Sequence, residues 1–283
     1  MMQRSSIATF FLYCGVALFL VVTLAPVAWL GVMSISLPSD LTTKPLSLIP
    51  HQVDFSRYAR LLTFEANSPG EAFLMALRNS LLSSLGATAL SLLVAVPAGW
   101  AFSRYRNRGV SVVLYSILAT YMTPAVALIL PLYFLLSMLG LLNNVLGLII
   151  VYCSILTPFT AWFIKSSFDA VPGELESAAA IDGASTLQTL WWVTLPYARA
   201  GVATAALFAI LLAWDEFFYG LLFTSNQNAK TLTVTIADFA AGRATDFGLV
   251  SAAGLLTALP PVLIAFILQK SLVAGLTAGS VKG

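Results

Sequence analysis

The stretch PGELESAAAIDGASTLQTLWWVTLP, residues 172–196, interrupts a strongly apolar chain with polar residues and turn formers. Pro172 suits the first turn of a helix, because its missing N–H would have no intrahelical partner there. Glu174 and Glu176 follow within that turn, where the positive end of the helix dipole stabilises acids. A run of three alanines comes next, and alanine favours helix more than any other residue. These residues predict a short helix that begins close to Pro172.

The second half of the same stretch predicts a turn and a further helix. Gly183 is a suitable helix stop, because glycine adopts the left-handed backbone of a C-terminal cap without strain. Ser185 or Thr186 can cap a second helix that runs to Pro196. We therefore expect a helix–turn–helix whose first helix presents a flat face of small side chains, either to the groove of another protein or to the membrane interface alone.

The rest of the chain is too apolar for a soluble protein. Hydrophobic residues make up 59% of the 283 residues and charged residues only 9%, whereas soluble domains carry about 25% charged residues. Six apolar segments are long enough to cross a bilayer as helices: Ile7–Met33, Phe73–Phe102, Val110–Met138, Leu146–Ile164, Gly201–Phe223 and Gly248–Leu268. The first is too long for a cleaved signal peptide. Prolines within several segments, such as Pro124, predict bends.

The arginines between the segments predict the orientation. Residues 103–109 carry three arginines and residues 139–144 carry no lysine or arginine, so the positive-inside rule places 103–109 in the cytoplasm. Both termini and the 172–196 stretch are then cytoplasmic. We expect a multi-pass protein divided as follows: an N-terminal helix at 1–33, an extracytoplasmic loop at 34–72, a core at 73–271 that contains the cytoplasmic loop 168–196, and a cytoplasmic tail at 272–283.

The cytoplasmic loop resembles the EAA loop of ABC importer permeases, which carries Glu-Ala-Ala-x3-Gly-x9-Ile-x-Leu-Pro. Ser177 stands where that family has glutamate, and Val193 replaces the isoleucine. The resemblance implies that the loop docks on a partner ATPase, with Glu174 or Glu176 as substitute carboxylates. The coupling residues that it implies are Glu174, Glu176, Ser177, Ala178, Ala179, Asp182, Gly183, Val193, Leu195 and Pro196.

The C-terminal residues carry a second resemblance. Residues 275–283 read GLTAGSVKG, which is similar to the Gly-Leu-Thr-x-Gly-x-Val-Lys-Gly tail of one of the two maltose-type permease subunits. The resemblance implies that Gly275, Gly279 and Lys282 reach into the ATPase dimer. A glycine-rich tail forms no stable helix alone, so we expect it to be extended.

Together the two resemblances imply an all-α ABC type I importer permease of six transmembrane helices, a five-helix core with one added N-terminal helix, in the bacterial inner membrane. They imply half of the path for a carbohydrate or a related polyol or sugar-phosphate solute. The implied partners are a sister permease in a heterodimer, two ATP-binding subunits that hold ATP and Mg, and an extracytoplasmic solute-binding protein. No run of lysine and arginine is long enough to indicate nucleic acid.

Two adjacent acids, Asp215 and Glu216, lie inside the fifth apolar segment. An acid at the centre of a spanning helix costs about 2.5–3.5 kcal/mol unless it is paired or wetted. The two acids therefore either pair with a cation, for which Arg78 is the candidate, or line a polar path. The family usually has asparagine at the position of Asp215. The residues that we expect along the solute path are Asn79, Ser83, Tyr121, Tyr133, Trp214, Asp215 and Glu216.

Several motifs that would indicate an enzyme are absent from the sequence. No P-loop occurs in the sequence, and neither a nucleophile–histidine pair nor a metal-ligand cluster is present, so we expect the chain to be no enzyme and to hold no cofactor. An alternative is an ion-coupled transporter that uses Asp215 and Glu216. A membrane-embedded acid protease is disfavoured, because adjacent acids on a helix face different ways and cannot easily share a proton.

Overall fold

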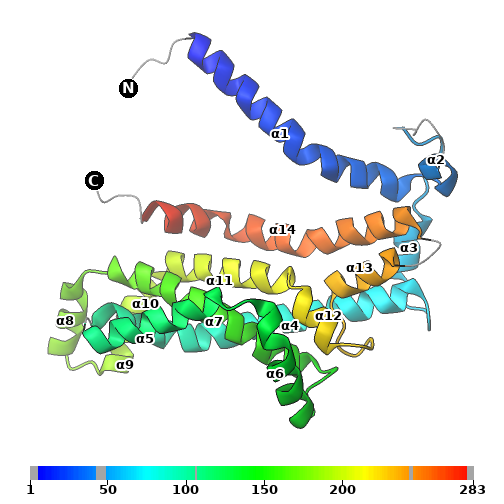
Figure 1. Cartoon of the computed structure of the whole chain (residues 1–283). Coiled ribbons are helices and arrows are strands. Elements are labelled where there is room, and N and C mark those ends of the chain that lie inside the picture. The colour runs from blue at the N-terminus through cyan, green and yellow to red at the C-terminus, as the bar shows by residue number, and fades with distance from the viewer. Residues whose placement is uncertain (1–5, 43–48, 106, 242–244, 279–283) are drawn as a thin grey trace. The chain divides into compact units, whose positions relative to one another are not determined.

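The computed structural model describes residues 6–42, 49–105, 107–241 and 245–278, and within these ranges its regular structure is entirely helical. This confirms the all-α fold that the composition predicts. Figure 1 shows the helices in chain order. Their bounds are α1 Ser6–Ile35, α2 Pro38–Thr42, α3 Ser56–Leu62, α4 Pro69–Arg104, α5 Arg108–Ala119, η1 Thr120–Met122, α6 Ala125–Met138, α7 Val145–Asp169, α8 Gly173–Ile181, α9 Thr186–Thr189, η2 Leu190–Thr194, α10 Leu195–Tyr197, α11 Arg199–Trp214, α12 Phe218–Phe223, α13 Leu232–Ala240 and α14 Phe247–Ala278.

Four helices in the described ranges are individually long and apolar enough to cross a membrane: Thr9–Ile35, Pro69–Arg104, Val145–Asp169 and Phe247–Gln269. Two bent pairs of helices also qualify when each pair is taken as one span, which raises the total to as many as six. The first pair joins Arg108–Met122 to Ala125–Met138 at 98°, and the second joins Thr186–Tyr197 to Arg199–Trp214 at 83°.

The third expected segment, Val110–Met138, is not one straight helix. It breaks between η1 and α6, where Thr123 has an extended backbone and Pro124 stands just before the first residue of α6. The cause is Pro124, because a proline disfavours helical backbone at the residue before it and offers no N–H to continue the helix.

The fifth expected segment, Gly201–Phe223, is also interrupted. Helix α11 ends at Trp214, and α12 begins only at Phe218. The two acids therefore lie at a break between helices and not within a continuous span. This corrects the expectation that both acids lie inside an uninterrupted apolar segment.

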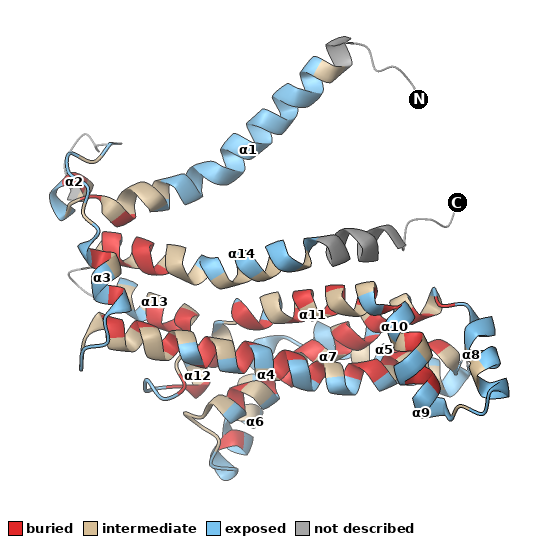
Figure 2. Cartoon of the chain, turned by 180° about the vertical axis from the view of Figure 1, so that it is seen from behind, coloured by how far each residue is buried: buried red, intermediate tan, exposed pale blue. Residues whose placement is uncertain are grey.

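The chain divides into two compact units. The first comprises Met1–Leu74 and Thr235–Leu259. Its most apolar helix is α1, which is exposed along most of its length in Figure 2. Near the end of α1 the buried Arg57 donates to the Ser36 carbonyl oxygen over 2.5 Å and to Asp246 over 3.1 Å. Full pairing of a buried cation in this way avoids its desolvation cost.

The second unit comprises Met75–Val234 and Pro260–Gly283. Helix α7 is its centre and packs chiefly against α11. The two helices approach closely at Gly201, where any side chain would collide with Ser167. Two apolar clusters fill the unit, one around Tyr152 and Leu156 and the other around Phe168. This unit contains the 172–196 stretch and the two acids.

Candidate functional site

The 172–196 stretch forms the helix–turn–helix that its residues predict. Helix α8 follows Pro172, and both Glu174 and Glu176 lie in its first turn. Ser185 caps α9 through its hydroxyl, which accepts from the Gln188 amide, while the Gln188 side chain accepts from the Ser185 amide. This reciprocal pair is a capping box, which satisfies two backbone donors that the helix start leaves free. The predicted cap at Ser185 is confirmed.

Gly183 ends α8 with a left-handed backbone, at φ +84°. The amide of Ala184 then donates to the Ala179 carbonyl oxygen over 2.9 Å, which closes the helix end. A residue with a Cβ is strained at this φ even where space is available. The turn between α8 and α9 therefore depends on glycine at this position, and the prediction of a glycine stop is confirmed.

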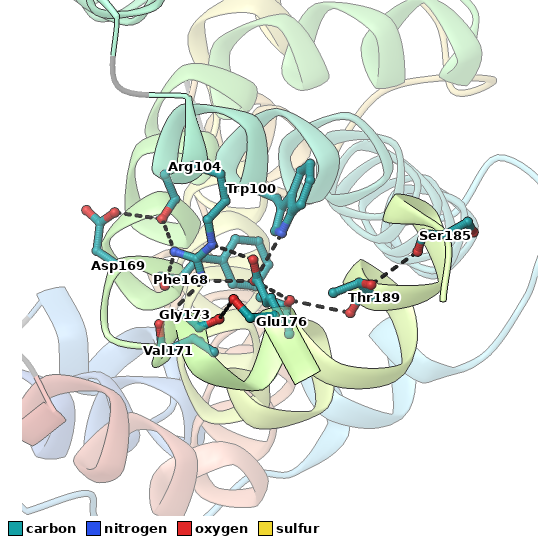
Figure 3. A network of polar contacts seen from close by, with 12 residues as sticks. Trp100, Arg104, Phe168, Asp169, Val171, Gly173, Glu176, Ser185 and Thr189 are labelled. Atoms are coloured by element: carbon teal, nitrogen blue, oxygen red, sulfur yellow. Dashed lines mark hydrogen bonds and ion pairs between the residues drawn. The ribbon is translucent and has the colours of Figure 1, made fainter. Parts of the chain in front are cut away.

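Glu176 and Arg104 form a partly buried ion pair that ties α8 to α4. The Arg104 Nε donates to Glu176 Oε2 over 2.8 Å, and its Nη2 donates to Oε1 over 2.9 Å (Figure 3). This is the bidentate geometry that makes arginine–carboxylate pairs strong. Only 20% of the Arg104 side chain and 14% of the Glu176 side chain are exposed.

The same carboxylate receives two further hydrogen bonds. The Thr194 hydroxyl of η2 donates to Glu176 over 2.6 Å, and the Trp100 indole of α4 donates over 3.3 Å. Arg104 also donates to the Phe168 carbonyl oxygen at the end of α7, over 3.1 Å. We call Trp100, Arg104, Glu176 and Thr194 the α8 brace. It joins α8 to α4, α7 and η2.

The brace determines the protonation of Glu176. Partial burial raises the pKa of this carboxyl, but the hydrogen bonds from Arg104 and Thr194 outweigh burial and leave the pKa below its ordinary value of 4.5. A lowered carboxyl pKa contributes stability that is fully present above the ordinary value and is lost as the pH falls through the lowered one. The brace is therefore charged and intact at neutral pH.

The brace separates the two candidate acids of α8. Glu176 points into the chain, whereas Glu174 is exposed, as are Ser177, Ala178 and Asp182. Ser177 donates to the Gly173 carbonyl oxygen of its own helix. The outer surface of the loop also carries apolar side chains, with Ile181 86% and Leu187 63% exposed. Of the two candidate glutamates, Glu174 is therefore the one on this surface, where Asp182 is exposed as well.

Arg104 is the contact of the 172–196 stretch that sequence reasoning missed. It belongs to the three arginines of 103–109, which indicate only the orientation of the chain. Nothing in the local pattern shows that the Arg104 side chain contacts a residue 72 positions later in the chain. The remaining loop residues lie as follows: Val193 and Leu195 are half-buried in η2 and α10, and Pro196 is exposed.

The expected path residues separate into two groups. Asn79 and Ser83 are buried, and the Asn79 amide donates to the carbonyl oxygens of Gln227 and Lys230 at 2.9 and 3.0 Å. Trp214 is buried as well. Burial and the hydrogen bonds of Asn79 indicate that these residues stabilise the packing of helices and loops.

The residues of the second group are exposed or line a cavity. Tyr133 is exposed on α6, and Asp215 is exposed at the helix break. Tyr121 and Glu216 line a common cavity of about 120 Å³. Sequence reasoning missed a third polar side chain of that cavity, Tyr152, because its position in an apolar segment gives no sign of where its hydroxyl lies.

The Glu216 side chain caps the N-terminal end of α12. Its carboxylate oxygens accept from the amides of Tyr219 at 2.9 Å and Gly220 at 3.1 Å. The helix start thereby supplies the hydrogen bonds that a carboxylate needs away from water. Arg78 is exposed, and no ion pair joins it to either acid in the part of the chain that the structure describes. The candidate pairing with Arg78 is therefore not found, which leaves the alternative that the acids line a polar path.

This difference between the two acids makes a prediction. Asp215→Asn should change the free energy of unfolding by no more than about 0.5 kcal/mol, as for other exposed substitutions. Glu216→Gln should destabilise by about 1–2 kcal/mol, because it removes the charge from a helix cap. Thermal unfolding of the detergent-purified variants measures both. A strongly destabilising Asp215→Asn that Arg78→Gln rescues would instead indicate an ion pair.

The C-terminal residues are only partly described. Gly275 lies within α14, which runs to Ala278, so residues 275–278 are helical and the extended conformation expected of the tail is not found there. Gly279 and Lys282 lie outside the described residues. Within the described ranges no group of three or more histidine, cysteine or acidic residues could hold a metal ion.

Comparison with known proteins gives an independent result. The family described as binding-protein-dependent transport system inner membrane component matches residues 91–277. The chain is 33% identical over 271 residues to the sulfoquinovosyl glycerol transport system permease protein SmoH of Agrobacterium fabrum, covering 96% of this chain and 93% of that protein. It is 30% identical over 283 residues to the trehalose/maltose transport system permease protein MalG of Thermococcus litoralis, covering 100% of both.

A solved structure extends the comparison to the fold. A chain of a bacterial ABC transporter involved in the import of the acidic polysaccharide alginate aligns with a TM-score of 0.78 at 24% identity. The alignment covers 95% of this chain and 99% of that chain. The helical arrangement expected from the sequence is therefore that of a known permease fold.

Proposed function

Because the chain belongs to the family of binding-protein-dependent transport system inner membrane components, we propose that it forms half of the path for a carbohydrate, or a related polyol or sugar phosphate. It is a transmembrane permease subunit of an ABC importer, and neither an enzyme nor an ion-coupled transporter. Importers of this family work with an ATPase, which binds the nucleotide, and with a solute-binding protein.

The names of related transport proteins support a carbohydrate as the solute. The names of two of them refer to sulfoquinovosyl glycerol and to trehalose or maltose, and each of these solutes contains a sugar ring. Such rings combine hydroxyls with apolar faces, which a protein recognises with a few placed polar groups among aromatic side chains. The cavity beside Tyr121, Tyr152 and Glu216 has this composition.

The α8 brace is the observation that carries the coupling mechanism. Helix α8 and α9 present the exposed Glu174, Ile181 and Leu187 to a partner. Because Glu176 ties α8 to α4 and Arg104 ties it to the end of α7, a displacement of α8 is conveyed to two spanning helices. ATP-driven closure of the ATPase would thus move the helices between inward-facing and outward-facing states.

The geometry of the loop and the family to which the chain belongs both support a proposed assembly. The 172–196 loop and both termini lie in the cytoplasm, where ATP is available, and the residues around Lys282 contact the ATPase dimer. A sister permease supplies the other half of the path in a heterodimer with two ATP-binding subunits. The segments 34–72 and 224–247 face outward toward the solute-binding protein.

Purification of the tagged chain in mild detergent, followed by mass spectrometry of the proteins that accompany it, tests this assembly. We expect an ATPase with a P-loop and a second permease in amounts comparable to the tagged chain. The matched control is the same chain with residues 172–196 replaced by a glycine–serine linker, which should lose the ATPase. Equal recovery of the ATPase with the linker would contradict docking through this loop.

A further inference from the structure

Three buried side-chain hydroxyls among the described residues, those of Thr88, Tyr152 and Thr257, have no hydrogen-bond partner. Of these three, the Tyr152 hydroxyl is of most interest, because Tyr152 lines a cavity together with Glu216. Tyr152 of α7 is 1% exposed, and its hydroxyl has no hydrogen-bond partner in the described part of the chain. Gly220 of α12 faces this hydroxyl, since a Cβ at Gly220 would lie 3.3 Å from its oxygen. Buried hydroxyls are nearly always hydrogen-bonded, to protein or to a bound molecule. The Tyr152 hydroxyl has the Glu216 carboxylate beside it and a cavity next to it, so a hydroxyl of a bound molecule could complete its hydrogen bonding.

The Glu216 carboxylate lies close to the Tyr152 hydroxyl. Each of its two oxygens accepts one backbone hydrogen bond from α12, and a carboxylate has room for about four. Glu216 can therefore accept a further hydrogen bond without giving up its place at the start of α12. One donor group and one acceptor group thus stand side by side, both fixed by the fold.

A cavity connects these two groups with an aromatic face. It measures about 120 Å³, and its lining includes Tyr121, Tyr152, Leu212 and Glu216. The Tyr121 hydroxyl donates to the Ile155 carbonyl oxygen over 2.8 Å, which holds its ring in place. The cavity adjoins a second one of about 670 Å³ that shares Tyr121 and Ile155. The larger cavity is in the size range of small-molecule sites.

We propose that the smaller cavity is a solute subsite that takes the edge of one neutral pyranose ring. A hydroxyl of the ring donates to Glu216 and accepts from Tyr152, while an apolar face of the ring lies against Tyr121. The rest of the solute occupies the larger cavity. This subsite rests on the proposed function and narrows its solute class.

The charges around the two cavities select against anionic solutes. Among the described residues that line them, Glu216 is the charged one, and neither cavity has a lysine or arginine in its lining. Asp215 adds a second acid at the same helix break. A phosphate, sulfonate or uronate would be repelled here. The subsite therefore takes neutral sugars, not sugar phosphates.

The test uses the assembled importer, with its binding protein, in ATP-loaded proteoliposomes. The probe is whichever of labelled maltose, trehalose and lactose the wild type imports fastest. Tyr152→Phe should lower the maximal uptake rate about 3- to 10-fold, the effect of one lost hydrogen bond. The KM should not change, because the binding protein captures the solute. Tyr115→Phe, an exposed tyrosine on α5 that lines neither cavity, is the control and should transport normally.

Two further measurements separate a solute contact from a structural role. Removal of an unpaired hydroxyl should not lower the melting temperature of the chain, whereas loss of packing would. Among monodeoxy analogues of the probe, one should be imported equally by the wild type and by Tyr152→Phe, because the analogue lacks the bonded hydroxyl. An unchanged uptake rate in Tyr152→Phe, or an equal loss for every analogue, would overturn the subsite.

The outcomes also separate this inference from the function on which it rests. If the wild type imports a neutral sugar and Tyr152→Phe does so equally well, only the subsite fails. If the 6-phosphate of the probe is imported as fast as the probe itself, the selection against anions is wrong. If the wild type hydrolyses ATP but imports none of the sugars, the carbohydrate class fails and the subsite fails with it.

Discussion

An importer that carries Glu176→Gln is expected to assemble but to move solute at about one tenth of the wild-type rate or less. Glutamine keeps the shape of the side chain but removes the charge that holds the Arg104 guanidinium. Breaking a fully buried ion pair costs about 3–5 kcal/mol and an exposed one contributes about 0–1, so this partly buried pair should cost about 2–3 kcal/mol. Coupling energies between sites are commonly about 1–3 kcal/mol, so a loss of this size uncouples α8 from α4.

The matched comparison is Glu174→Gln, the same substitution two residues earlier on the exposed side of α8. It should leave the melting temperature of the chain unchanged, whereas Glu176→Gln should lower it. The decisive measurement is solute imported per ATP hydrolysed in proteoliposomes. A Glu176→Gln importer with a normal ratio would show that the α8 brace conveys no motion.

Gly183→Val is expected to reduce both ATPase association and transport, each by about tenfold. The backbone at Gly183 has φ +84°, and a left-handed conformation costs an ordinary residue about 1–2 kcal/mol and a β-branched one more. No atom lies within 4 Å of a Cβ placed there, so the cost arises from the backbone and not from a collision. The turn would relieve that strain by changing the angle between α8 and α9. ATPase recovered with the tagged chain measures the effect.

Two variants show whether the position or the strain matters. Gly140 has φ +66° and equally free surroundings, but it lies in the link after α6, so Gly140→Val imposes a similar strain far from the loop. Gly183→Asn keeps a residue that tolerates the left-handed region, and it should restore most of the association. Normal association and uptake in Gly183→Val would remove the 172–196 loop from the coupling mechanism.

Local chemistry in the sequence predicts local structure well. Gly183 and Ser185 have the predicted roles because a helix stop and a helix cap depend on residues within one turn of each other. The same reasoning applies to Pro124, whose position shows that a bend is expected but not that it reaches 98°. The angle depends on how α6 packs, which no local pattern contains.

Long-range contacts are the part that the sequence does not reveal. Arg104 and Glu176 lie in separate segments, and only the packing of α4 beside α7 and η2 brings them together. The position of the Tyr152 hydroxyl beside Glu216 is also hidden in the sequence, because only the fold brings α7 and the start of α12 together. The break at Asp215 was hidden for a related reason, since the apolar pattern of Gly201–Phe223 continues across a short interruption. Charged residues within an apolar segment can therefore indicate a helix end as well as a path.

The most direct test of the account is uptake of labelled maltose, trehalose and lactose into proteoliposomes that contain the purified complex, with the solute-binding protein outside. We predict uptake that requires ATP inside the vesicles, that is unaffected when proton and sodium gradients are collapsed, and that falls about tenfold in Glu176→Gln. Uptake by this chain alone on an ion gradient, with no ATPase present, would contradict the account and would make Asp215 and Glu216 the coupling site.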